Sequence, residues 1–279
     1  MIRKVVLAVF VGLLLASVVS AQTGAWRFRW QSGQVLIYLV EQITSASEVV
    51  GESKVDTRTK LNLTKRWQVL GVDSAGVATL QLSLTALRIE TTTPGGDTLL
   101  FDSANLDKSN PQMREQLARF VNQPLALLRI DAKGKVVEVK ESKYGPASKY
   151  ENELPFIILL PDDAAQAGTK WGRAYQMTLD PPLGTSEKYP ASQSYQCKAV
   201  EGKTATVALT SAVSKLPEAL ADQVPLLQLQ PEGEVVFDLQ AGLLRSATLR
   251  IDKELTGHQG EGSRYRFQSS YKEEYQGGK

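Results

Sequence analysis

Polar and apolar residues alternate over long stretches of the chain, as expected for antiparallel β-strands with one buried face. The clearest run extends from Val55 to Val69. Every even position in it is polar, and the odd positions carry valine, threonine, leucine, tryptophan and one lysine. At ~3.4 Å per residue, this run predicts a single strand of about 50 Å. A strand of this length suits a half-barrel or another curved sheet better than a compact sandwich.

A second alternating run returns from a turn over 71–76. Its apolar positions are Ala78, Leu80, Leu82, Leu84 and Ala86. The apolar positions then change phase at Leu87 and Ile89, which predicts a β-bulge. Upstream, Trp26–Trp30 alternates aromatic residues with two arginines. We interpret it as an edge strand with outward arginines, the alternative being a surface that stacks on a polyanion.

One clear helix is predicted at about 110–121. Asn110 followed by Pro111 has the character of an N-cap and a first-turn proline. The apolar residues that follow at helical spacing are Met113, Leu117, Phe120 and Val121. A hairpin follows, with strands at 125–130 and 136–140. Its turn, Asp131–Gly134, predicts a positive φ at Gly134.

The same order of elements recurs more weakly later, with a short helix at about 217–224 and a hairpin over 235–251. The fold class is therefore mainly β, with long antiparallel strands in two related halves, 22–141 and 169–275. Residues 142–168 connect the halves and 276–279 form a frayed tail. Within the connector, Leu154–Leu160 contains Pro155, so we expect an edge segment or buried connector over one end of the sheet.

The first 21 residues have the character of a signal peptide. Arg3 and Lys4 precede an apolar run, Val5–Val19, and small residues end at Ala21. We expect cleavage near Ala21 and export to the periplasm or the extracellular space; the alternative is an uncleaved membrane anchor. The rest of the sequence predicts no membrane span.

Cleavage would remove two of the 32 Lys and Arg residues and none of the 30 Asp and Glu residues. The mature chain would be close to neutral, which argues against a nucleic-acid partner. Cys197, the only cysteine, excludes an intramolecular disulfide and is expected to be a buried strand residue. His258, the only histidine, is expected to be solvated in a glycine-rich loop.

The pairs Asp162-Asp163 and Glu273-Glu274 are the remaining route to acid–base chemistry. Adjacent acids of this kind most often cap a helix or face water. With no catalytic motif in the sequence, we expect no enzyme, no cofactor and no metal site.

Several short motifs resemble those of a family of secreted bacterial β-rich proteins of unknown function. They are Trp30–Gln34, Thr91–Asp102 with its Pro94-Gly95-Gly96 turn and the following Ser103, Leu128–Val139, Leu160-Pro161 and Ala167–Gly172. The resemblance implies export and a β-rich fold but no activity. The expected architecture is also similar, more distantly, to that of periplasmic lipoprotein and lipid carriers, a likeness that does not fix function.

Two functions follow as hypotheses. In the first, the protein is a periplasmic or envelope module that binds an apolar small molecule or lipid. The expected lining is Leu61, Leu63, Trp67, Leu80, Leu82, Leu84, Leu117 and Phe120. In the second, it is a structural or protein-interaction component of the cell envelope, and these residues fill a core that holds no ligand. An empty apolar volume of several hundred Å³ would favour the first hypothesis.

Overall fold

The computed structural model describes residues 24–150 and 158–278. The predicted signal peptide, 1–21, and the first four residues of Leu154–Leu160 lie outside these ranges. The first six strands are β1 (Val35–Val50), β2 (Ser53–Val72), β3 (Ala78–Thr92), β4 (Thr98–Asp102), β5 (Pro124–Ile130) and β6 (Val136–Ser142). The remaining strands are β7 (Lys170–Leu179), β8 (Glu187–Glu201), β9 (Thr204–Val213), β10 (Glu232–Asp238), β11 (Leu243–Thr256) and β12 (Arg264–Gly277).

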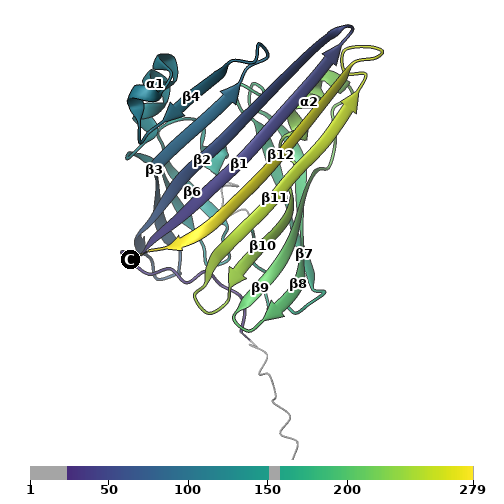
Figure 1. Cartoon of the computed structure of the whole chain (residues 1–279). Coiled ribbons are helices and arrows are strands. Elements are labelled where there is room, and N and C mark those ends of the chain that lie inside the picture. Colours follow the sequence, from purple (N-terminus) through teal and green to yellow (C-terminus); the bar gives the residue numbers. More distant parts are fainter. Residues whose placement is uncertain (1–23, 151–157, 279) are drawn as a thin grey trace, which may run out of the picture.

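Within the described residues, these strands form one antiparallel sheet of twelve strands. Its order is β6-β5-β3-β2-β1-β12-β11-β10-β9-β8-β7, and β4 pairs with β3. Because β6 and β7 stand at opposite ends of this order, the sheet is not closed. Figure 1 shows the long strands β2, β1, β12 and β11 running side by side across the middle of a curved sheet. The predicted mainly β fold with long antiparallel strands is confirmed.

The strands of the two predicted halves meet at the centre of this sheet, where β1 pairs with β12 from Ile37 to Val49. The run predicted at Val55–Val69 lies within β2, which extends for 20 residues. The predicted bulge is confirmed, because the β2–β3 register shifts so that Thr64 faces Ala86 but Lys65 faces Leu84. Thr85 is the extra residue of β3 at this point.

The predicted first helix is α1 (Pro111–Leu117), which continues as a 3₁₀ turn over Ala118–Phe120. The Asn110 side chain accepts hydrogen bonds from the N–H groups of Gln112 and Met113, as an N-cap does.

The second helix, α2 (Leu220–Leu227), lies three residues further along than expected and contains Pro225. Leu226 is fully buried against Met177, Leu179 and Ala191, and this burial favours the helix beyond the proline.

Two turns have the same sequence form and the same hydrogen bonds. In Asp73–Gly76 and Asp131–Gly134, the aspartate carboxylate accepts hydrogen bonds from the backbone N–H groups two and four residues later. The glycines have φ values of 79° and 89°, so the positive φ predicted for Gly134 is confirmed. The surroundings differ. A Cβ atom on Gly134 would lie 2.6 Å from Phe28 Cε2, whereas nothing lies within 4 Å of one on Gly76.

The segment Trp26–Trp30 is not an edge strand as expected; it is an extended crossing segment that joins two distant turns. The Phe28 N–H donates to Ala132 O at 2.7 Å, and the Arg29 N–H donates to Gly242 O at 3.0 Å. The Phe28 ring stacks on Trp30 at 4.9 Å and meets Phe237 edge-on at 5.1 Å. The aromatic side chains therefore enter the core. An edge strand would instead have joined the sheet through backbone hydrogen bonds alone.

The main core lies against this crossing segment and contains residues from strands toward both ends of the sheet order. Its fully buried members include Trp67, Leu80, Leu128, Tyr195, Val207 and Phe237. The described end of the connector adds Ile158 and Leu160, both buried, and the Leu160 N–H donates to Lys133 O at 2.9 Å. A second, smaller core lies under α2. The concave face of the sheet is thus filled at the end crossed by Trp26–Trp30.

The turns Asp73–Gly76 and Asp131–Gly134 allow a matched test of how the crossing segment packs. Gly76→Val should lower the free energy of unfolding by about 1–2 kcal/mol, through backbone strain alone. Gly134→Val should cost at least ~1 kcal/mol more, because its side chain must displace Phe28 or the Ile158 carbonyl. Urea denaturation of the two variants measures the difference. Equal losses would show that Phe28 does not pack against the turn.

The turn between β10 and β11, Asp238–Gly242, predicts a pH dependence. Asp238 is buried and accepts hydrogen bonds from the N–H groups of Gln240 and Ala241 and from the Arg245 guanidinium. Burial alone would raise the pKa of Asp238. The Ala241 N–H and Arg245 outweigh it, so this pKa lies below its ordinary value. A carboxyl group whose pKa is lowered by folding stabilises the protein above its unfolded pKa of about 3.9, and the stabilisation is lost as the pH falls through the folded pKa.

Asp238→Asn should therefore cost about 1–3 kcal/mol at pH 7, because charge-assisted hydrogen bonds are lost. The difference between wild type and variant should shrink below about pH 4. Denaturant titrations from pH 7 to pH 3 measure it. Asp252→Asn is the control, because Asp252 forms a similar arginine pair in an exposed position and should cost under ~1 kcal/mol. A pH-independent difference at Asp238 would contradict the assignment.

Candidate functional site

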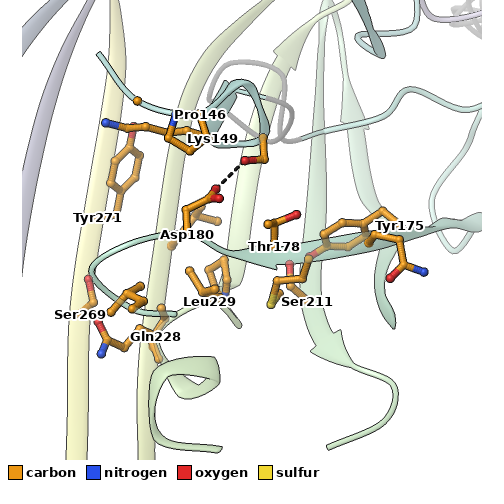
Figure 2. Close-up of a pocket in the computed structure, with 18 of the residues that line it drawn as sticks. Pro146, Lys149, Tyr175, Thr178, Asp180, Ser211, Gln228, Leu229, Ser269 and Tyr271 are labelled. Carbon is orange, nitrogen blue, oxygen red and sulfur yellow. Dashed lines mark hydrogen bonds between the residues drawn. The ribbon is translucent and has the colours of Figure 1, made fainter. Parts of the chain in front are cut away.

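A cleft of about 630 Å³ lies on the concave face of the sheet, on the side of the main core away from the crossing segment. One side of it consists of inward-facing residues of β1, β12 and β11. The other side is formed by β7, the loop 180–183 after it, and the segment 144–149. Figure 2 shows the labelled side chains of these elements converging around the same space. The cleft thus combines elements from both halves of the sequence.

A set of amide and hydroxyl side chains lines the buried side of the cleft. This polar lining consists of Gln42, Gln193, Ser211, Ser269 and Tyr271. Gln42 Nε2 donates to Ser269 Oγ at 3.2 Å, and Gln193 Nε2 donates to Ser211 Oγ at 3.1 Å. Gln193, Ser211 and Ser269 are each at least 93% buried: their exposed fractions are 2%, 4% and 7%. Four of the five members of the polar lining are therefore held in two hydrogen-bonded pairs.

Apolar side chains line the same cleft between these polar groups. This apolar lining consists of Met177, Leu229, Leu249 and Ile251. The register explains the mixture. Leu249 lies opposite Tyr271 and Ile251 lies opposite Ser269, so neighbouring strands contribute one polar and one apolar residue at each level. The cleft therefore offers both hydrophobic contact and hydrogen bonding.

Charges of both signs stand near the mouth of the cleft. Lys149 is exposed, and Asp180 accepts hydrogen bonds from the Ser148 and Ser186 hydroxyls. The Ser148 bond, drawn dashed in Figure 2, joins the 144–149 segment to the loop after β7. Arg250 lies between the inward-facing Leu249 and Ile251, and its exposed guanidinium pairs with Glu232 on the outer face of the sheet. The mouth therefore shows no dominant sign of charge among the described residues.

Lys65 and Glu273 form a buried ion pair that contacts the hydroxyl group of Tyr271. Lys65 Nζ is 3.6 Å from Glu273 Oε1 and donates to the Tyr271 hydroxyl at 3.3 Å, and that hydroxyl in turn donates to Glu273 Oε2 at 2.9 Å. Glu273 is wholly buried, contrary to the expectation that it caps a helix or faces water. Glu274 is exposed and pairs with Lys272. The two glutamates separate because successive strand residues point to opposite faces.

None of the eight expected lining residues lines the cleft. Trp67, Leu80 and Leu82 are buried in the main core, and Leu84 and Phe120 pack against it. Leu61, Leu63 and Leu117 are half-buried. Phe120 contacts a cleft residue from outside the cleft: its ring meets that of Tyr144 edge-on, with the ring centroids 4.6 Å apart.

The cleft residues escaped the sequence analysis because that analysis expected an apolar lining. Gln42, Ser269 and Tyr271 have polar side chains at inward positions, and such positions look solvent-facing when only the sequence is known. One signal was present. Lys65 is the single charged residue among the odd positions of the Val55–Val69 run, and it is buried in contact with Tyr271, one of the cleft residues.

The other residues with chemical potential have structural surroundings. Cys197 is buried, as predicted, and burial raises the pKa of its thiol. His258 is not solvated as expected: it is 7% exposed, and its Nε2 lies 2.9 Å from Glu48 Oε1. Asp162 is exposed and pairs with Lys133. Across residues 24–150 and 158–278, no cluster of three or more His, Cys, Asp or Glu residues could hold a metal ion.

No helix in the described part of the chain is long and apolar enough to cross a membrane. No protein-family model and no curated protein matches the chain.

Among solved structures, the chain has a distant likeness to one described as "Lipid-protein interactions in lipovitellin". The TM-score is 0.47 at 15% identity, over 90% of this chain and 26% of that one. The chain thus spans about a quarter of the lipovitellin chain. A second likeness is to DynF from the dynemicin biosynthesis pathway of Micromonospora chersina, with a TM-score of 0.23 at 8% identity. It covers 92% of this chain and 86% of that one.

Proposed function

We propose that this protein is an exported binding module of the cell envelope that holds an apolar or amphipathic small molecule in the cleft, without catalysis. The cleft itself carries the proposal. Its volume of about 630 Å³ falls within the ~300–1,000 Å³ of small-molecule sites, which are typically apolar with a few placed polar groups. The apolar and polar linings supply both features.

The close packing of the rest of the interior supports the same proposal. Protein interiors pack as densely as organic crystals, and the main core follows this rule, with Trp67, Leu80 and Phe237 fully buried. Against this background, an open volume lined by Met177, Leu249 and Ile251 is a departure from close packing. A ligand in the cleft would bury the apolar surface that its lining still presents to water, which is favourable.

A structural or protein-interaction component of the envelope is the second candidate function. It is favoured by the burial of Trp67, Leu80 and Leu82, which were expected to line a cavity and instead pack in the main core. Binding to the cleft distinguishes the two candidates, because a purely structural protein would hold no ligand there.

The test is the binding of the uncharged fluorescent probe N-phenyl-1-naphthylamine. Wild-type protein should bind the probe, and Leu229→Trp should weaken binding roughly tenfold or more, equivalent to ~1.4 kcal/mol, because the larger side chain fills part of the cleft. Leu216→Trp is the matched control: Leu216 is 47% exposed, does not line the cleft, and should leave binding unchanged. No probe binding by the wild type, or equal effects of the two tryptophans, would refute the proposal.

Export is tested separately, by N-terminal sequencing of the protein recovered from outside the cytoplasm. Cleavage after Ala21 should give a mature chain that begins at Gln22, because small residues precede that bond and an apolar run precedes them. An Ala21→Arg variant should accumulate uncleaved. Recovery of the wild type with Met1 retained on membrane-bound protein would contradict the export proposal.

A further inference from the structure

We infer that the ligand is an amphiphile with one acyl chain and an uncharged, hydroxyl- or amide-bearing head, and that the head lies against the polar lining. This inference rests on the proposed function and deepens it by naming the chemical class of the ligand. Three observations carry it: the size of the cleft, the position of its polar side chains, and the way in which the nearby charges are compensated.

The volume limits the ligand to one chain. A methylene group takes about the space of one liquid water molecule, ~30 Å³, so 630 Å³ holds one chain of roughly 12–18 carbons with a small head. A two-chain phospholipid, with roughly 40 or more non-hydrogen atoms, exceeds this space by the same measure. The cleft therefore fits a single-chain molecule.

The polar lining places the head group at the buried side. Across β1, β12 and β11, the side-by-side residues are Gln42, Tyr271 and Leu249. The next inward-facing residues along β12 and β11 are Ser269 and Ile251, which lie opposite each other. A hydrocarbon chain against these amide and hydroxyl groups would exclude water without replacing its hydrogen bonds, which is costly for buried polar groups. A head that both donates and accepts hydrogen bonds avoids this loss. The chain then lies along Met177 and Leu229.

The charges near the polar lining disfavour a charged head. Lys65 and Glu273 carry opposite charges within 3.6 Å of each other and are linked through the Tyr271 hydroxyl, so they present no net charge to the cleft. Arg173 does not line the cleft; its Nε donates to Gln193 Oε1 at 2.6 Å and its guanidinium lies over the Tyr175 ring. A carboxylate or phosphate head would thus be desolvated against neutral amides and hydroxyls.

The side chains of Gln42 and Ser269 are well suited to a neutral head. The Gln42 amide donates to Ser269 Oγ through its Nε2, which directs its carbonyl oxygen elsewhere as an acceptor. The Ser269 hydroxyl also lies 3.5 Å from Thr44 Oγ1. A ligand hydroxyl can donate to the Gln42 carbonyl oxygen and accept from a hydroxyl of the polar lining.

The test is displacement of N-phenyl-1-naphthylamine by three ten-carbon amphiphiles below their micelle concentrations at pH 8. They are 1-monodecanoylglycerol, which is neutral, decanoate, which is anionic, and decyltrimethylammonium, which is cationic. The monoglyceride should displace the probe at a concentration roughly tenfold or more below that needed by either ion. Native mass spectrometry of the loaded protein should show one bound monoglyceride.

Gln42→Leu should weaken monoglyceride binding roughly five- to tenfold more than it weakens probe binding, because it removes hydrogen-bonding groups that the probe does not use, without removing bulk. Ser269→Ala provides an independent variant should Gln42→Leu fail to fold. Gln268→Leu is the matched control, since Gln268 is exposed and bonds to Asp252 on the outer face of β12.

The outcomes separate this inference from the proposed function. If calorimetry shows that neither the probe nor any of the three amphiphiles binds the wild type, the proposed function fails and the ligand class fails with it. If ligands bind but an ion competes as well as the monoglyceride, or two chains are bound, the assigned class alone is overturned. A Gln42→Leu variant with unchanged monoglyceride binding, matched by Ser269→Ala, also overturns the assigned head-group position.

Discussion

The fold depends on covering the apolar concave face of a sheet that does not close on itself. An open curved sheet leaves its inner side chains in water unless other parts of the chain cover them. Here the crossing segment Trp26–Trp30 does so at one end, tied by hydrogen bonds to the Asp131–Gly134 turn and to Gly242. Its rings pack against Phe237 on β10 and Trp171 on β7, while the Phe28 N–H reaches the β5–β6 turn near the other end of the sheet order. A short segment outside the sheet thereby unites its two sides.

The position of the cleft follows from this one-sided covering. Along β1, the inward positions change from Leu36, Tyr38 and Val40, all buried, to Gln42 and Thr44, which are half-buried. The apolar positions lie at the end that the crossing segment covers, and the polar positions begin where that cover stops. The Lys65–Glu273 pair stands at the change. Burying such a pair gains little stability compared with apolar packing, so its presence at this level is better explained by the polar surface it supports than by stability.

The sequence predicted the elements whose cause is local. The alternation of β2, the bulge at Thr85, the N-cap at Asn110 and the positive φ of Gly134 each depend on a few neighbouring residues, and each is confirmed. The cleft depends instead on distant pairings such as Gln42 with Tyr271, which only the assembled sheet creates. His258 shows the same limit, because its glycine-rich surroundings indicate a solvated loop, while the folded chain places its ring against Glu48 of β1 and Tyr265 of β12.

The separation between the main core and the cleft has an energetic consequence. Trp67, Leu80 and Phe237 are fully buried, and none of them lines the cleft, so the contacts of the main core are separate from those that a ligand would make. A ligand that binds only the folded state adds RT ln(1 + [L]/Kd), which is ~2.7 kcal/mol when its concentration is 100 times Kd. Substitutions such as Gln42→Leu can therefore change binding without removing core contacts. Release of the proposed ligand would therefore leave the core contacts in place, as the proposed binding function requires.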